Sequence, residues 1–133
     1  MSPSRKKVLI ADDERRWREY ARNLLAADYD VEMVTDCETT VARVEQGGVD
    51  LLVLDHLMPG EEPFGTGYDV CVHLRKQHPD LPIILFTGAW EGVDAGWEEL
   101  ERKADAVVVF KEVRDRERDD LAARVHALLA RPR

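Results

Sequence analysis

Five short strand-like runs recur along the chain, and segments with helical periodicity separate them from one end to the other. Four of the runs are apolar on both faces, which is typical of strands buried in a parallel sheet. The runs are Val8–Ala11, Val31–Val34, Leu51–Leu54, Ile83–Phe86 and Ala106–Phe110. This strict alternation excludes an all-helical or all-strand protein and predicts an α/β fold.

Apolar residues between the runs recur at helical spacing and predict five amphipathic helices. In the first of them Trp17, Tyr20, Ala21, Leu24 and Leu25 stand at i, i+3, i+4, i+7 and i+8, which puts them on one helix face. The predicted helices occupy about 17–25, Thr39–Gln46 (closed by Gly47-Gly48), Tyr68–Gln77, Val93–Ala104 and Leu121–Leu129.

Five βα units are too few for a closed eight-stranded barrel. We therefore expect an open, doubly wound, five-stranded parallel sheet of flavodoxin-like order 2-1-3-4-5, with helices on both faces and right-handed crossovers. In that order the first and third strands are neighbours, and ligands bind at their carboxyl ends. The 133 residues suffice for one domain, so we expect a single domain over 1–133 with a core from about 7 to 129.

Charge and hydropathy exclude several classes of protein. A net charge of −8 gives no general attraction for nucleic acid. The longest apolar run, Ala106–Phe110, is far shorter than the roughly 20 residues of a membrane span, and the basic N-terminus leads into no secretory signal. Cys37 and Cys71 form neither a metal motif nor a disulfide framework, which favours reduced thiols in a cytoplasmic protein.

Polar residues follow four of the strand-like runs. Asp12 and Asp13 end the first run, Asp55 the third, Thr87 the fourth and Lys111 the fifth. Because parallel strands end at one edge of the sheet, we expect these side chains to converge. Asp13 as a helix N-cap, Thr87 as a turn residue and Lys111 as a solvated cation are ordinary alternatives for each residue taken alone. Together at four strand ends, they predict a site.

Three clustered carboxylates repel one another unless one is protonated or a cation lies among them. Hard oxygen ligands in a compact site suit Mg²⁺, with Asp12 and Asp13 as its holders. Asp55, alone at a central strand end, is the best candidate for a nucleophile that attacks phosphorus. Lys111 can pair with phosphoryl oxygens, and the Thr87 hydroxyl can donate a hydrogen bond to one of them.

These residues resemble the signature of response-regulator receiver domains from bacterial two-component signalling, and we expect a stand-alone, slightly atypical member. The matching segments are Val8–Glu14, Leu51–Gly60, Ile83–Gly88 and the strand ending at Lys111. The resemblance implies that Asp55 is the phosphoacceptor and that Asp12, Asp13, Asp55 and the Leu57 backbone carbonyl bind Mg²⁺. It also implies that Thr87 and Lys111 bind the phosphoryl group, which a sensor histidine kinase or a phosphotransfer protein supplies.

The chain departs from this family's pattern at three places. Glu112 follows Lys111 where the family usually has proline, and Val107 or Val108 stands where the family usually has an aromatic switch residue. The loop Pro59–Gly67 is longer than usual, and it could cover the site, serve a partner or be a tolerated surface insertion. Trp90, three residues after Thr87, could shield the site, meet a partner or simply pack.

We expect a phosphorylation-dependent signalling switch, a monomer or phosphorylation-linked dimer that transfers the phosphoryl group to itself, loses it slowly and is not an enzyme with a separate substrate. A downstream protein would bind the face of the fourth helix, fifth strand and fifth helix; no direct nucleic-acid or membrane contact is expected. The main alternative is a receiver-like binding module that is never phosphorylated. A phosphatase of the aspartyl-phosphate type would want an aspartate at Leu57, and a flavodoxin would not place acids at its phosphate site.

Overall fold

The computed structural model describes residues 5–88, 102, 107–110 and 120–130. The predicted helix Val93–Ala104, apart from Arg102, lies outside the described residues, and so do Trp90, Lys111 and Glu112. At Val107 and Val108 the backbone alone is described.

A parallel sheet forms the centre of the molecule, with strands in the order β2-β1-β3-β4-β5. The flavodoxin-like order of the first four strands confirms the predicted α/β topology, and β5 pairs in parallel with β4. The strands are β1 (Lys7–Ala11), β2 (Asp30–Val34), β3 (Leu51–Leu54), β4 (Ile83–Thr87) and β5 (Val107–Phe110).

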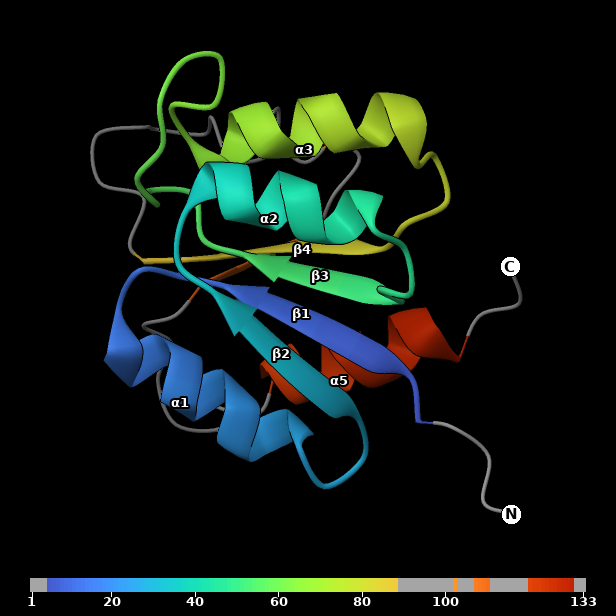
Figure 1. The fold of residues 1–133 in the computed structure, drawn as a ribbon. Coiled ribbons are helices and arrows are strands. Elements are labelled where there is room, and N and C mark those ends of the chain that lie inside the picture. The colour runs from blue at the N-terminus through green and yellow to red at the C-terminus, as the bar shows by residue number, and fades with distance from the viewer. Residues whose placement is uncertain (1–4, 89–101, 103–106, 111–119, 131–133) are drawn as a thin grey trace.

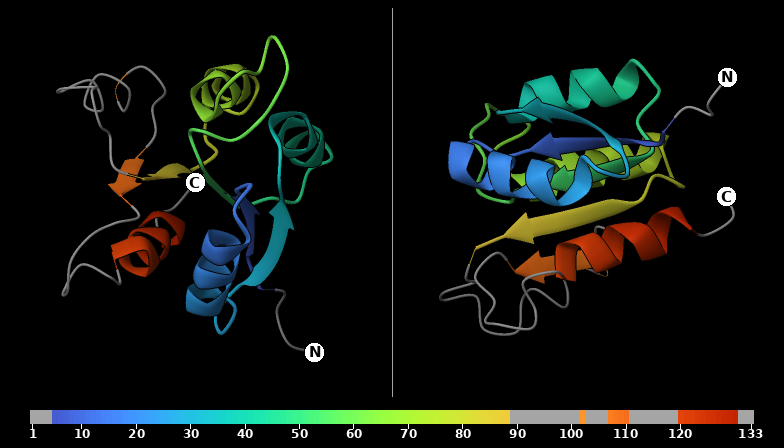
Figure 2. Two further views of the ribbon diagram at one scale, coloured as in Figure 1. Left: turned by 90° about the vertical axis from the view of Figure 1, so that its left-hand side faces the viewer. Right: turned by 90° about the horizontal axis from the view of Figure 1, so that it is seen from below.

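Helices cover both faces of the sheet, as Figures 1 and 2 show. α2 (Cys37–Glu45) and α3 (Gly67–Gln77) lie on one face, and α1 (Arg15–Leu25) and α5 (Asp120–Leu129) lie on the other. Within the part of the chain that the structure describes, no helix is long and apolar enough to cross a membrane.

Alternation along the strands divides the core into two clusters. Leu9, Leu52 and Leu54 pack with residues of α2 and α3. Val8 and Val53 pack with residues of α1 and α5. The period of two in a strand therefore explains why these fully apolar runs are buried on both faces.

Local signals set where the helices begin and end. α2 begins at Cys37, two residues before the predicted Thr39, because the Asp36 carboxylate caps it by accepting a hydrogen bond from the Thr39 amide at 2.7 Å. Gly47 and Gly48 follow α2 with φ angles of 88° and 85°, which a side chain would strain. α3 begins with a capping box in which Thr66 and Asp69 exchange hydrogen bonds.

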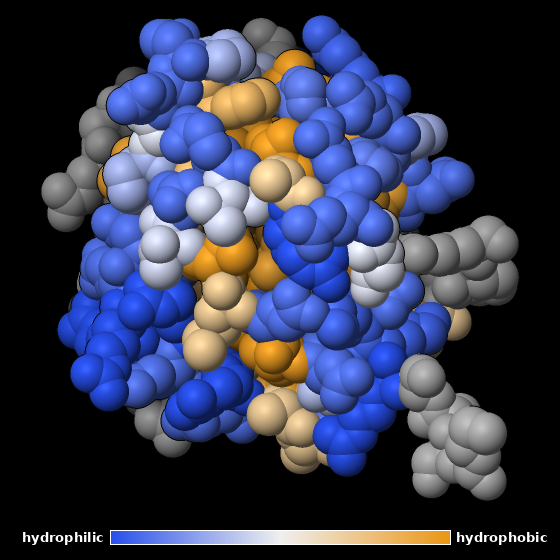
Figure 3. Space-filling model, viewed as in Figure 1, coloured by the Kyte–Doolittle hydropathy of each residue, from blue (hydrophilic) through white to orange (hydrophobic). Residues whose placement is uncertain are grey.

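The surface is mainly hydrophilic, with apolar side chains visible in strips between the elements on the face shown in Figure 3. Among the described residues, the large hydrophobic side chains that stand exposed are Met33, at 40%, and Leu57, at 72%. Met33 belongs to β2, which lies at the edge of the sheet, whereas Leu57 lies at the candidate site.

Candidate functional site at the carboxyl ends of β1 and β3

The backbone aligns the acidic residues at the ends of β1 and β3. Ala11 pairs with Leu54, and the Asp55 amide donates to the Ala11 carbonyl at 2.9 Å, so that the ladder continues past the last residue of β3. On the other side of β1, the Asp12 amide donates to the Val34 carbonyl at 3.1 Å. Asp12 and Asp55 therefore leave adjacent strands at the same level.

The carboxylates of Asp12, Asp13 and Asp55 meet at this point. One oxygen from each lies within 4.8 Å of the others. Asp12 and Asp55 are buried, with 2% and 5% of their surfaces exposed, and Asp13 is open to solvent. This close group of like charges in a partly dry setting is unfavourable without a cation.

The ordinary N-cap role expected for Asp13 as an alternative is wrong. The N-cap of α1 is Glu14, whose side chain makes no capping hydrogen bond. The Glu14 amide instead donates to Oδ1 of Asp12 at 2.9 Å. One Asp12 oxygen is thereby fixed by the backbone, and Asp13 is not used in capping the helix.

A cavity of about 170 Å³ opens beside the carboxylates. Asp13 and Asp55 line it together with Leu57 and Gly88. Gly88 directly follows Thr87, which ends β4 and is 1% exposed. Thr87 thus stands at the carboxyl end of the strand next to β3, as predicted, while Lys111 lies outside the described residues.

Two residues of α1 also line this cavity, Arg16 and Trp17. Sequence reasoning placed Trp17 in the core and gave Arg16 no role. The signal that could have found them is their position in the first turn after Asp12-Asp13, since side chains there lie beside the strand ends.

The first turn of α3 packs tightly against the backbone of Asp55 and His56. The Gly67 amide donates to the His56 carbonyl at 2.7 Å, and a Cβ at Gly67 would overlap the backbone oxygen of Asp55. Burial lowers the pKa of His56, an effect that nearby Asp69 opposes. His56 is not among the described residues that line the cavity.

The long loop Pro59–Gly67 packs against α2 and α3. The Cys37 amide donates to the Pro59 carbonyl at 3.0 Å, and the Glu61 amide donates to Oε2 of Glu38 at 2.8 Å. The ring of Phe64 meets that of His73 edge-on, with centroids 5.0 Å apart. These contacts attach the loop to α2 and α3. Of the described residues that line the cavity, none comes from Pro59–Thr66.

Comparison with known proteins identifies the family. Residues 8–125 match the family model described as "Response regulator receiver domain". The chain is 33% identical over 132 residues to "Response regulator MprA" of Mycobacterium leprae, covering 94% of this chain and 51% of the relative, and 32% identical to the protein of the same name in Mycobacterium avium. The chain thus spans about half the length of these curated relatives.

Solved structures share the fold. A putative response regulator from Chloroflexus aurantiacus is 27% identical and superposes with a TM-score of 0.79, covering 96% of this chain and all of that one. The response regulator protein TrrA from Thermotoga maritima, solved "in complex with Mg(2+)-BeF", is 29% identical with a TM-score of 0.72, covering 92% and 98% of the two chains. The chain therefore belongs to the response regulator receiver domain family of two-component signalling.

Proposed function

We propose that Asp55 accepts a phosphoryl group beside a Mg²⁺ ion and that the chain is thereby a phosphorylation-dependent switch. The observation that carries this proposal is the meeting of the Asp12, Asp13 and Asp55 carboxylates within 4.8 Å at the ends of two adjacent strands. This is the switch point of a doubly wound sheet, where ligands bind.

The donor set fits a hard divalent cation. Carboxylate oxygens are the ligands that Mg²⁺ prefers, and the ion usually retains waters and takes phosphate oxygens as further ligands. Asp12, Asp13, Asp55 and the Leu57 backbone carbonyl would hold it, and Leu57 does line the same cavity. Bound there, the ion would neutralise charge on the transferring phosphoryl group.

Asp55 is the best nucleophile of the three acids. One Asp12 oxygen already accepts a hydrogen bond from the Glu14 amide, and Asp13 is exposed to water. Asp55 is buried and lines the cavity through which a donor would approach. A carboxylate oxygen of Asp55 attacks phosphorus, the bond from phosphorus to the leaving group breaks, and the leaving group takes the electron pair. Attack by water later returns inorganic phosphate and the free carboxylate.

Thr87 and Lys111 complete the proposed site. The buried Thr87 hydroxyl at the end of β4 donates a hydrogen bond to a phosphoryl oxygen, and the Lys111 ammonium pairs with another. The added charge draws Thr87 toward the phosphoryl group and biases the surface made by the fourth helix, β5 and α5. A sensor histidine kinase or a phosphotransfer protein supplies the group, and a downstream protein reads that surface.

Intact-mass spectrometry tests the proposal. Treatment with acetyl phosphate and Mg²⁺ should add the mass of one phosphoryl group to the wild-type chain. Asp55→Asn should abolish the gain, because an amide is no nucleophile here. The exposed Asp80 provides the matched control, since Asp80→Asn removes the same charge away from the site.

Absence of any mass gain in the wild type, with Mg²⁺ present, would contradict the proposal. A receiver-like module that binds its partner without phosphorylation would then be the better account. An equal gain in Asp55→Asn would move the acceptor to another residue.

A further inference from the structure

The cavity beside Asp55 has one cationic side chain in its lining that the chemistry above does not use. Of the lining residues that the structure describes, Arg16 is the one with a positively charged side chain, while Asp13, Glu14 and Asp55 are acidic. The Arg16 side chain is 73% exposed, so its guanidinium stands at the mouth and not in the interior.

The Arg16 guanidinium lies over the ring of Trp17. The carbon of the guanidinium lies 4.9 Å from the centroid of the Trp17 ring, which is a cation–π contact. Trp17 in turn meets Tyr20 and Phe86 edge-on, with ring centroids 5.4 and 5.8 Å apart. Phe86 belongs to β4 and is buried, so the platform under Arg16 is anchored in the core.

Arg16 is also poorly placed for the stability of its own helix. It lies in the first turn of α1, where the helix dipole disfavours cations and where no acidic residue stands. Neighbouring Arg15 has an ion pair with Glu19 one turn on, at 3.1 Å, but the corresponding position for Arg16 is Tyr20. The contact of Arg16 with Glu14 is long, at 3.9 Å, and exposed, so it contributes little. Arg16 thus departs from the usual charge preference of a helix N-terminus, and a residue that breaks a local rule is a candidate for function.

We propose that Arg16 binds the anionic phosphodonor at the mouth of the cavity, an inference that rests on the proposed function. The ligand class is a small acyl phosphate, whose phosphoryl oxygens must approach three carboxylates in a chain of net charge −8. A guanidinium offers paired N–H donors that match a phosphoryl group, and the Trp17 platform fixes the direction of those donors. Arg16 lowers the donor concentration needed for transfer and leaves the chemistry to Asp55.

The rate of phosphorylation, followed by intact mass against acetyl phosphate concentration at saturating Mg²⁺, tests this role. In Arg16→Ala the half-saturating concentration should rise by about two- to fivefold, which lies within the range for an exposed charge pair, while the maximal rate stays unchanged within error. The half-saturating concentration of Arg16→Lys should lie between those of the wild type and Arg16→Ala. Arg15→Ala is the matched control, because it removes the same charge from the adjacent position but not from the cavity lining.

A binding measurement separates this inference from the proposed function. Acetonylphosphonate has a P–C bond in place of the scissile P–O bond of acetyl phosphate, so it binds without transfer. Its dissociation constant, measured by NMR titration, should rise by the same factor in Arg16→Ala and stay unchanged in Arg15→Ala. If the wild type gains no phosphoryl mass, the proposed function fails. The ratio of the acetonylphosphonate dissociation constants of Arg16→Ala and wild type still shows whether Arg16 binds the anion.

Two results would overturn the role of Arg16. One is a pair of identical saturation curves and dissociation constants for Arg16→Ala and Arg15→Ala. The other is a lowered maximal rate with an unchanged half-saturating concentration, which would assign Arg16 to the shape of the Asp55 site and not to donor binding.

Discussion

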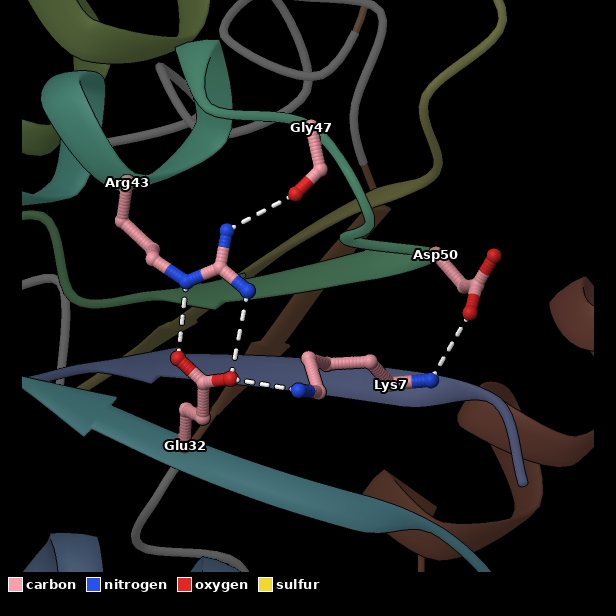
Figure 4. A network of polar contacts seen from close by, with 5 residues as sticks. All are labelled: Lys7, Glu32, Arg43, Gly47 and Asp50. Carbon is pink, nitrogen blue, oxygen red and sulfur yellow. Dashed lines mark hydrogen bonds and ion pairs between the residues drawn. The ribbon is translucent and has the colours of Figure 1, made fainter. Parts of the chain in front are cut away.

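Acidic side chains cluster at two regions of the sheet. In one region the carboxylates lie beside one another, and in the other they are paired with cations or amides. At the carboxyl ends of β1 and β3, Asp12, Asp13 and Asp55 face one another. Toward the other end of β1, Glu32 and Asp50 are each matched by a cation or an amide (Figure 4). Both regions are parts of one small sheet, so the difference comes from the side chains and not from the backbone.

The balanced region is a network built around Glu32 of β2. Arg43 at the end of α2 donates to both Glu32 oxygens, at 2.7 and 3.1 Å, and also to the Gly47 carbonyl at 2.8 Å. The Lys7 ammonium lies 2.6 Å from the same carboxylate, and the Lys7 amide donates to Asp50 at 2.7 Å. The hydrogen bonds from Arg43 and Lys7 lower the pKa of Glu32 to about 2.

The comparison separates a carboxylate whose charge is matched by two cations, Glu32, from three carboxylates that lie within 4.8 Å of one another and that we propose bind a cation. Groups whose charges are matched within the chain stabilise the folded state and have nothing left to offer a ligand. Carboxylates held close together raise the free energy of the ion-free protein, and a cation relieves that cost. Three experiments test this separation of the matched carboxylate from the clustered acids.

Neutralising the acids at the carboxyl end should have opposite effects on metal binding and on stability. In the double variant Asp12→Asn/Asp13→Asn, Mg²⁺ affinity should fall by about a hundredfold, because two hard ligands are lost. Without Mg²⁺ the variant should be more stable than the wild type by about 1 kcal/mol, because repulsion is removed. Calorimetric titration and urea unfolding measure the two quantities. Loss of stability in the ion-free variant would show that the acids are structurally satisfied and would end the comparison.

Truncating the central cation of the network should only destabilise. Arg43→Ala leaves Glu32 with one cationic partner and the Gly47 carbonyl without its donor, and should cost about 1–2 kcal/mol in the free energy of unfolding. Mg²⁺ affinity should not change. Arg15→Ala, which breaks an exposed pair with Glu19 and should cost about 0.5 kcal/mol or less, is the control for the loss of an arginine. A changed Mg²⁺ affinity in Arg43→Ala would mean that the two regions are coupled.

The smallest effect is the pH dependence contributed by Glu32. Because the folded-state pKa lies below the ordinary 4.5, this carboxylate stabilises the fold above about pH 4.5, and the contribution is lost as pH falls toward 2. Glu32→Gln should therefore be less stable than the wild type at pH 7 by about 0.5 kcal/mol, a figure kept low by the 37% exposure of the side chain. The difference in the free energy of unfolding between the wild type and Glu32→Gln, measured by urea unfolding, should narrow at about pH 4, 3.5 and 3. A gap of constant size would assign the effect to packing.

The convergence of Asp12, Asp13 and Asp55 could be predicted from the sequence more readily than the contacts that surround these residues. Apolar runs that stop at Asp12, Asp55 and Thr87 mark strand ends, and parallel pairing brings such ends to one edge, so convergence follows from topology. Helical periodicity placed Trp17 on the inner face of α1. It could not show that Trp17, besides packing against the core, also lines the cavity.

Contacts between distant segments could not be predicted in this way. The pairing of Arg43 with Glu32 depends on how α2 packs over β2, which neither periodicity nor spacing specifies. The Thr66–Asp69 capping box, by contrast, is a local signal that was present in the sequence and was missed, because the segment was interpreted as an enlarged loop.

The position of the Glu32 network on β2 has a consequence for self-association. Among the described strands, β2 forms an outer edge of the sheet, and a bare strand edge can template pairing with another copy of the chain. Asp30 and Glu32 place negative charges along this edge. A second molecule that added its own β2 there would meet the exposed charge of Asp30, whereas the charge of Glu32 is already matched by Lys7 and Arg43, so Asp30 is the residue that discourages edge-to-edge pairing.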